Sequence, residues 1–119
     1  MSTDATPGET DSTPSNPVQV EGRDELDALV DQHDVVLVDF YADWCGPCKM
    51  VEPIVERLAA ETEAVVGKVD VDVEQSLAAS VGVRGVPMML VFADGEQVEE
   101  LVGARPEQQL RSLVEGYLD

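Results

Sequence analysis

Basic residues are scarce in this sequence. Seven lysines and arginines stand against 25 aspartates and glutamates, which gives the 119-residue chain a formal charge of −18. A surface this acidic repels polyanions, so nucleic acids and anionic membranes are poor partners. The chain also lacks a long apolar run and an amino-terminal basic region. We therefore expect no membrane span, no secretory signal and a cytoplasmic location.

Cysteine and histidine are equally rare. The two cysteines lie three positions apart and the only histidine is His33. This pattern argues against a secreted disulfide scaffold and indicates a reducing compartment. Aromatic residues make up only 4% of the chain, whereas hydrophobic residues make up 44%. A core is therefore available, and valine, leucine and alanine must supply most of it.

The negative charge itself points to a saline environment. Self-repulsion at a charge of −18 should destabilise a compact chain in dilute buffer. At molar salt the screening length falls to about 3 Å, and most of that repulsion disappears. We interpret the composition as that of a cytosolic protein from an extreme halophile, in preference to an acidic protein from a mesophile.

The chain divides into a short leader and one domain. Residues 1–17 are rich in proline, threonine, serine and acidic residues and contain no basic residue. Such a segment cannot bury enough apolar surface to offset its ordering entropy, so we predict a disordered acidic leader, solvated rather than an interaction tail. Residues 18–119 have the apolar periodicity of a globular domain.

Apolar periodicity predicts the element order βαβαβαββα. The segment from Val35 to Ala42 is apolar on both alternating faces except at Asp39, as in a central strand covered on both sides. This alternation predicts an α/β fold with a central mixed sheet and helices on both faces. The predicted strands are 18–20, 35–42, 65–73, 88–93 and a return strand through 98–102. The helices are near 24–30, from about 45, at 74–81 and from Pro106.

The two cysteines, in the run Trp44-Cys45-Gly46-Pro47-Cys48, lie where the buried strand gives way to a helix. This spacing places both sulfurs on one side of the first helical turn, close enough to form a disulfide. Cys45 lies at the positive end of the helix dipole, which favours the nucleophilic thiolate. Cys48 should be more buried and keep its proton longer. Cys45 can then attack a client disulfide, and Cys48 can resolve the mixed disulfide.

Two other interpretations of the cysteine pair remain open. A CxxC pair is half of a typical zinc site, but a second CxxC is absent and His33 is the only histidine. The pair could also be an inert part of the core, although its position beside Gly46 and Pro47 argues against that.

The sequence resembles the thioredoxin family along residues 18–119. The resemblance rests on the run from Val38 to Lys49, on Pro53, on Lys68, on the segment from Gly82 to Pro87 and on Gly103. It implies the thioredoxin fold and a general protein-disulfide reductase that is itself reduced by a thioredoxin reductase. It also implies a monomer that needs no cofactor beyond its Cys45–Cys48 disulfide.

The resemblance assigns roles to two charged residues beside the cysteines. Asp39 is the only charge in a strand that is otherwise apolar on both faces, and a buried carboxylate has a raised pKa. The resemblance makes Asp39 the proton acceptor and donor for Cys48; a carboxylate at a frayed strand end is the alternative. Periodicity places Lys68 on a solvated face, and only the resemblance brings it near Asp39.

The client-binding residues are assigned in the same way. The resemblance implies a cis bond at Val86-Pro87, packed against the cysteines, which exposes backbone at Val86 for strand pairing with a client. Gly103 would let the client backbone approach. Trp44 would lie at the rim of the client groove rather than in the core, and Gly46 and Pro47 would border the same groove.

Three departures from the usual pattern bear on specificity. Met88 stands where threonine is usual, and Tyr41 stands where tryptophan is frequent. Neither touches the sulfur chemistry, but because of both departures the family's usual client preference does not carry over to this chain. Gly46 and Pro47 leave no histidine between the cysteines, which favours a reductant over an oxidase or isomerase. A redox-inert binding module using the same groove is a third alternative.

Overall fold

The computed structural model describes residues 14–118, so most of the predicted leader lies outside the described residues. Within that range the elements follow one another in the order βαβαβαββα, which confirms the predicted order. The strands are β1 (Val18–Gln19), β2 (Val35–Tyr41), β3 (Val65–Asp70), β4 (Met88–Ala93) and β5 (Glu96–Val102). The helices are α2 (Arg23–Gln32), α3 (Gly46–Glu61), α4 (Gln75–Val81) and α5 (Glu107–Tyr117).

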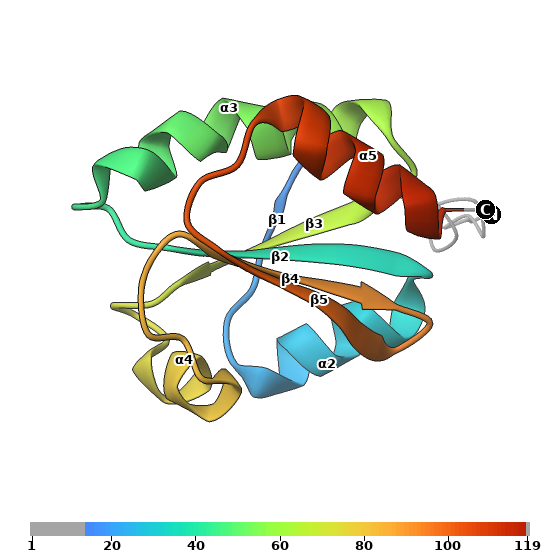
Figure 1. Ribbon diagram of the computed structural model, residues 1–119. Coiled ribbons are helices and arrows are strands. Elements are labelled where there is room, and N and C mark those ends of the chain that lie inside the picture. Colours follow the sequence, from blue (N-terminus) through green and yellow to red (C-terminus); the bar gives the residue numbers. More distant parts are fainter. Residues whose placement is uncertain (1–13, 119) are drawn as a thin grey trace, which may run out of the picture.

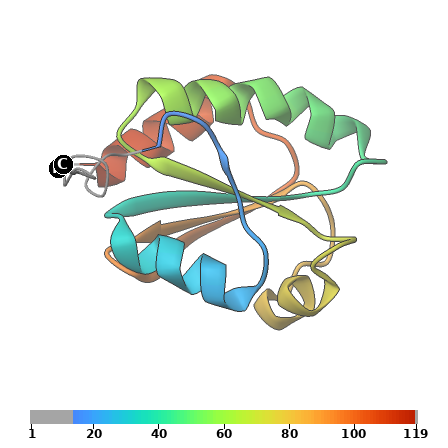
Figure 2. The ribbon, with the colours of Figure 1, turned by 180° about the vertical axis from the view of Figure 1, so that it is seen from behind.

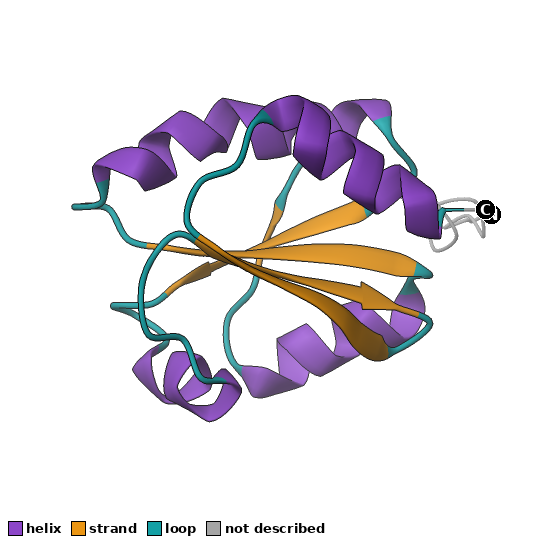
Figure 3. Ribbon diagram, viewed as in Figure 1, coloured by secondary structure: helices purple, strands orange, loops and turns teal. Residues whose placement is uncertain are grey.

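The strands form one twisted mixed sheet with the order β1-β3-β2-β4-β5 (Figures 1 and 3). β1 and β2 both pair with β3 in parallel, whereas β2 pairs with β4 and β4 with β5 in antiparallel register. β2 therefore lies at the centre of the sheet, which explains why its sequence is apolar on both faces.

Helices cover both faces of the sheet, as the sequence predicts. α3 and α5 pack on one face, and α2 and α4 pack on the other (Figures 1 and 2). Side chains of β2 alternate between the two layers: Val36 and Val38 join the cluster beneath α2, whereas Leu37 joins the cluster beneath α3. Because Asp39 is two residues beyond Leu37, its side chain lies on the α3 face.

Several element boundaries differ from the prediction, by one residue in β1, β2 and α4 and by three residues in β3. β3 ends at Asp70 rather than at residue 73, because the Asp70 carboxylate accepts the N–H groups of Asp72 (2.9 Å) and Val73 (3.4 Å) and turns the chain. Pro106 is the N-cap of α5 rather than part of its first turn. Periodicity therefore predicts which elements form, whereas the end of β3 is set by side-chain hydrogen bonds of Asp70.

Three connections meet at one end of the sheet. They are the β2–α3 turn, the α4–β4 loop and the β5–α5 loop, all at the left of Figure 1. This end carries both cysteines and the Val86–Pro87 bond. Within residues 14–118, no helix is both long enough and apolar enough to cross a bilayer.

Candidate active site

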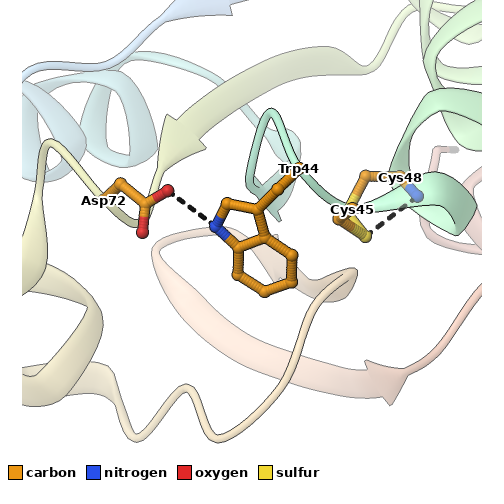
Figure 4. The surroundings of a disulfide bond; sticks show 4 residues. All are labelled: Trp44, Cys45, Cys48 and Asp72. Atoms are coloured by element: carbon orange, nitrogen blue, oxygen red, sulfur yellow. Dashed lines mark hydrogen bonds between the residues drawn. A yellow bond between two sulfur atoms is a disulfide. The ribbon is translucent and has the colours of Figure 1, made fainter.

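The two cysteines occupy the first turn of α3. Cys45 is the N-cap of this helix, and the sulfur of Cys45 is bonded to that of Cys48, with their Cα atoms 5.3 Å apart. The backbone N–H of Cys48 points at the Cys45 sulfur, with 3.1 Å between nitrogen and sulfur (Figure 4). An N-cap acceptor at the positive end of a helix is stabilised as an anion. The backbone therefore favours a thiolate at Cys45 once the disulfide is reduced.

The predicted difference in burial between the two cysteines is wrong. Cys45 is 4% exposed and Cys48 is 5% exposed, because both cluster with Ala42 and because Val71 and Val86 pack against this cluster. Their surroundings differ instead. Cys48 lines a small cavity of about 30 Å³ together with Asp39 and Lys68, which is room for about one water molecule. Cys48 therefore shares a cavity with the Asp39 carboxylate, whereas Cys45 does not line that cavity.

Asp39 is the carboxylate in this cavity. It is 1% exposed, and within the described residues its Oδ1 atom has no hydrogen-bond partner. Burial is the main cause that raises its pKa to about 6; the Lys68 ammonium lowers the pKa, and the Glu52 carboxylate raises it. Asp39 can therefore change its protonation state close to neutral pH, as a proton carrier for a neighbouring thiol must. The frayed-strand alternative does not fit this burial.

Lys68 lies in register with Asp39 on the adjacent strand β3. The solvated position that periodicity predicts is wrong, because α3 covers this face and leaves the Lys68 side chain only 14% exposed. Its Nζ atom lies 3.0 Å from Glu52 Oε2 and 4.5 Å from the centre of the Tyr41 ring. Sequence reasoning missed these two partners, since no local pattern links positions on separate elements.

Trp44 lies at the surface rather than in the core, with 71% of its area exposed. Its indole Nε1–H donates a hydrogen bond of 2.8 Å to Asp72 Oδ2 in the turn after β3 (Figure 4). The ring borders a groove of about 340 Å³ that Val71, Arg84 and Val86 also line. Asp72 is a second residue that the sequence did not reveal, because it lies 28 positions from its partner.

The remaining predicted residues lie around the disulfide. The Val86–Pro87 bond is cis, and Val86 packs against the cluster that contains both cysteines. The Pro87 carbonyl accepts the N–H of Gly103 at 2.8 Å, which brings the β5–α5 loop to the same place. Gly103 has a φ of +92°, a conformation that favours glycine. Gly46 and Pro47 are exposed on the first turn of α3.

The zinc interpretation of the cysteine pair finds no set of ligands. Among residues 14–118, no group of three or more histidine, cysteine or acidic side chains could hold a metal ion. The two sulfurs are bonded to each other in this structure. The arrangement is that of a redox pair with a buried carboxylate behind it.

Comparison with known proteins gives a consistent result. The Thioredoxin family pattern matches residues 17–116. A thioredoxin from Staphylococcus saprophyticus is 45% identical over 89 residues, which cover 73% of this chain and 86% of that protein. The structure of a mutant thioredoxin from Halobacterium salinarum NRC-1 is 56% identical, covers 91% of this chain and 96% of its own, and superposes with a TM-score of 0.88. A Plasmodium falciparum thioredoxin is 35% identical, covers 84% of this chain and 98% of its own, and gives 0.75.

Proposed function

Since the chain belongs to the thioredoxin family, whose members are thiol–disulfide oxidoreductases, we propose that it is a general protein-disulfide reductase. The observation that carries this proposal is the Cys45–Cys48 pair at the start of α3, with the Cys48 N–H directed at the Cys45 sulfur. The family uses its own cysteine pair and no external cofactor. The two electrons for each client disulfide therefore come from the two thiols.

The reaction proceeds in two exchange steps. The Cys45 thiolate attacks one sulfur of the client disulfide, so that a mixed disulfide forms and the other client sulfur leaves as a thiolate. Asp39 then takes the proton of Cys48 through the cavity that both residues line. The Cys48 thiolate attacks Cys45, the second client thiolate leaves, and the disulfide seen in the structure forms. We assign Lys68 to holding Asp39 partly ionised, since its charge lowers the pKa of that carboxyl.

The client would bind across the end of the sheet where the three connections meet. Trp44, Gly46 and Pro47 form one side of this surface, and Val86 and Gly103 form the other, with Pro87 buried beneath them. Outside the helices and strands, the backbone–backbone hydrogen bonds of residues 14–118 do not use Val86. Its backbone can therefore pair with an extended client segment by strand addition.

Family membership also supports proposals about partners and place. Thioredoxins reduce disulfide substrates and are themselves reduced by thioredoxin reductase. We propose the same for this chain, with disulfide-containing client proteins as substrates and a thioredoxin reductase as the electron donor. We propose further that it acts as a monomer in the cytoplasm, where a reducing pool keeps its dithiol available.

Insulin reduction tests the proposed function. With dithiothreitol in ~3 M KCl, which limits charge repulsion, the protein should accelerate the precipitation of reduced insulin, measured as turbidity. The Cys45→Ser variant should be no faster than dithiothreitol alone. A redox-inert binding module would leave both proteins at that background rate. A midpoint potential above about −180 mV, as in disulfide isomerases, would contradict the reductase direction.

We also propose that the protein works at high salt. The support is the charge of −18, the low lysine content and the similarity to the Halobacterium salinarum protein. Thermal unfolding should therefore occur about 10 °C or more higher in ~3 M KCl than in ~0.1 M KCl, because screening removes self-repulsion. Circular dichroism at both salt concentrations measures this difference. Equal midpoints would favour an acidic protein from a mesophile.

A further inference from the structure

The few basic residues of this chain differ in whether they form ion pairs. Five ion pairs in residues 14–118 engage four of the seven basic residues, namely Arg23, Arg57, Lys68 and Arg111. The other three are Lys49, Arg84 and Arg105, and none of them has a carboxylate of the described residues within 4.0 Å. The chain has more than three acidic residues for each basic one, so carboxylates are abundant and a basic residue without a carboxylate partner is unexpected.

These three cations without a carboxylate partner lie at the end of the sheet that carries the disulfide, one on α3, one in the α4–β4 loop and one in the β5–α5 loop. Lys49 follows Cys48 on α3 and is exposed. Arg84, also exposed, lines the groove beside Trp44 and Val86. In the β5–α5 loop, the Arg105 guanidinium donates a hydrogen bond of 2.7 Å to the Val102 carbonyl and lies 3.6 Å from where a Cβ on Gly103 would stand. We call Lys49, Arg84 and Arg105 the cationic rim.

Three acids and three apolar side chains share this surface. Asp43 is exposed beside Trp44, and Asp72 is held by the Trp44 indole. The carboxylate of Glu52 is already paired with Lys68. Trp44, Met50 and Val102 are at least 55% exposed and provide apolar contact area. The surface around the disulfide therefore combines apolar contact area with a charge close to zero, on a molecule whose formal charge is −18.

We propose that the cationic rim selects client proteins that carry aspartate or glutamate next to the cysteines of their disulfide. This inference rests on the proposed function and names its substrate class. A carboxylate beside the scissile bond would meet an unpaired guanidinium or ammonium there, whereas most of the remaining surface would repel it. At molar salt only such direct contacts persist, because charges separated by more than about 3 Å are screened.

Two synthetic peptides test this selection. Each is closed by one internal disulfide; one has glutamate on both sides of each cysteine, and the other has glutamine. The full-length protein is reduced, freed of reductant and mixed with each peptide, at the lowest KCl concentration at which circular dichroism shows it folded. Free peptide thiols are counted by chromatography over time. We expect the glutamate peptide to react about tenfold faster, since each exposed ion pair contributes a factor of about 1.5 to 5.

A matched pair of variants assigns the effect to the rim. Arg84→Gln should reduce the ratio of the two peptide rates about threefold, whereas Arg23→Gln, which removes an exposed charge on α2, should leave the ratio unchanged. Equal rates for both peptides in the parent protein, or an equal fall in both variants, would overturn the selection while leaving the reductase function intact. If neither peptide were reduced, the proposed function and this inference would both fail.

Discussion

Replacement of Cys48 by serine is expected to leave the protein covalently attached to its client through Cys45. The N-cap position and the Cys48 backbone N–H favour the Cys45 thiolate, and both are retained in the variant because the hydrogen bond comes from the main chain. The first exchange step therefore still occurs. The second step loses a thiol held next to the mixed disulfide, and effective molarities for such intramolecular groups reach about 10⁵ M.

The loss of turnover should be correspondingly large. With millimolar dithiothreitol as the only resolving thiol, insulin reduction by Cys48→Ser should fall by about 100-fold or more. Non-reducing electrophoresis should show a client adduct that dithiothreitol releases. Cys45→Ser is the matched control, since it keeps one thiol in the same turn but should form no adduct. Adducts of equal amount in both variants would contradict the assignment of Cys45 as the nucleophile.

Asp39→Asn should change stability and activity in opposite directions. The folded state raises the pKa of this carboxyl from 3.8 to about 6, chiefly through burial. A raised pKa means that the folded protein prefers the protonated form. The stability that the protonated Asp39 carboxyl contributes is therefore fully present below about pH 4. It is lost as the pH rises to about 6 and remains absent above that. At about 1.4 kcal/mol per pKa unit, ionised Asp39 costs the folded state about 3 kcal/mol near pH 8.

The neutral asparagine avoids this cost. The variant should be about 3 kcal/mol more stable than the parent protein at about pH 8 and nearly equal to it below about pH 4, as urea unfolding in high salt would measure. Release of client from the mixed disulfide should become about 100-fold slower, because Cys48 loses its proton acceptor. Asp43→Asn, which removes an exposed carboxylate nearby, should show neither effect. Equal pH profiles for the two variants would refute the role of Asp39.

Residues close together in the sequence account for most of what could be predicted. The unbroken apolar run of β2 marks the centre of the sheet, and the four-residue motif from Cys45 to Cys48 places two sulfurs in one helical turn. Asp39 could be recognised because its charge interrupts that run. Each of these inferences depends on the period of a strand or helix, which local backbone geometry sets.

The features that the sequence predicted wrongly, or did not reveal, all depend on contacts between residues far apart in the chain. The burial of Lys68 depends on α3 lying over β3, and periodicity along one strand does not contain that information. The predicted difference in cysteine burial was wrong because both cysteines belong to one cluster, against which Val71 and Val86 from other parts of the chain pack. The hydrogen bond from Trp44 to Asp72 joins a residue before α3 to one after β3.

The sequence by itself determined the order of the elements and the identity of the redox pair, because these depend on neighbours within one or two turns of chain. Only the tertiary structure decided which charges meet. It buried Asp39 opposite Lys68, paired Lys68 with Glu52, and left Lys49, Arg84 and Arg105 without carboxylate partners among the described residues around the disulfide. Charge interactions act across space between residues far apart in the chain, so the packing of helices on the sheet, and not local periodicity, sets them.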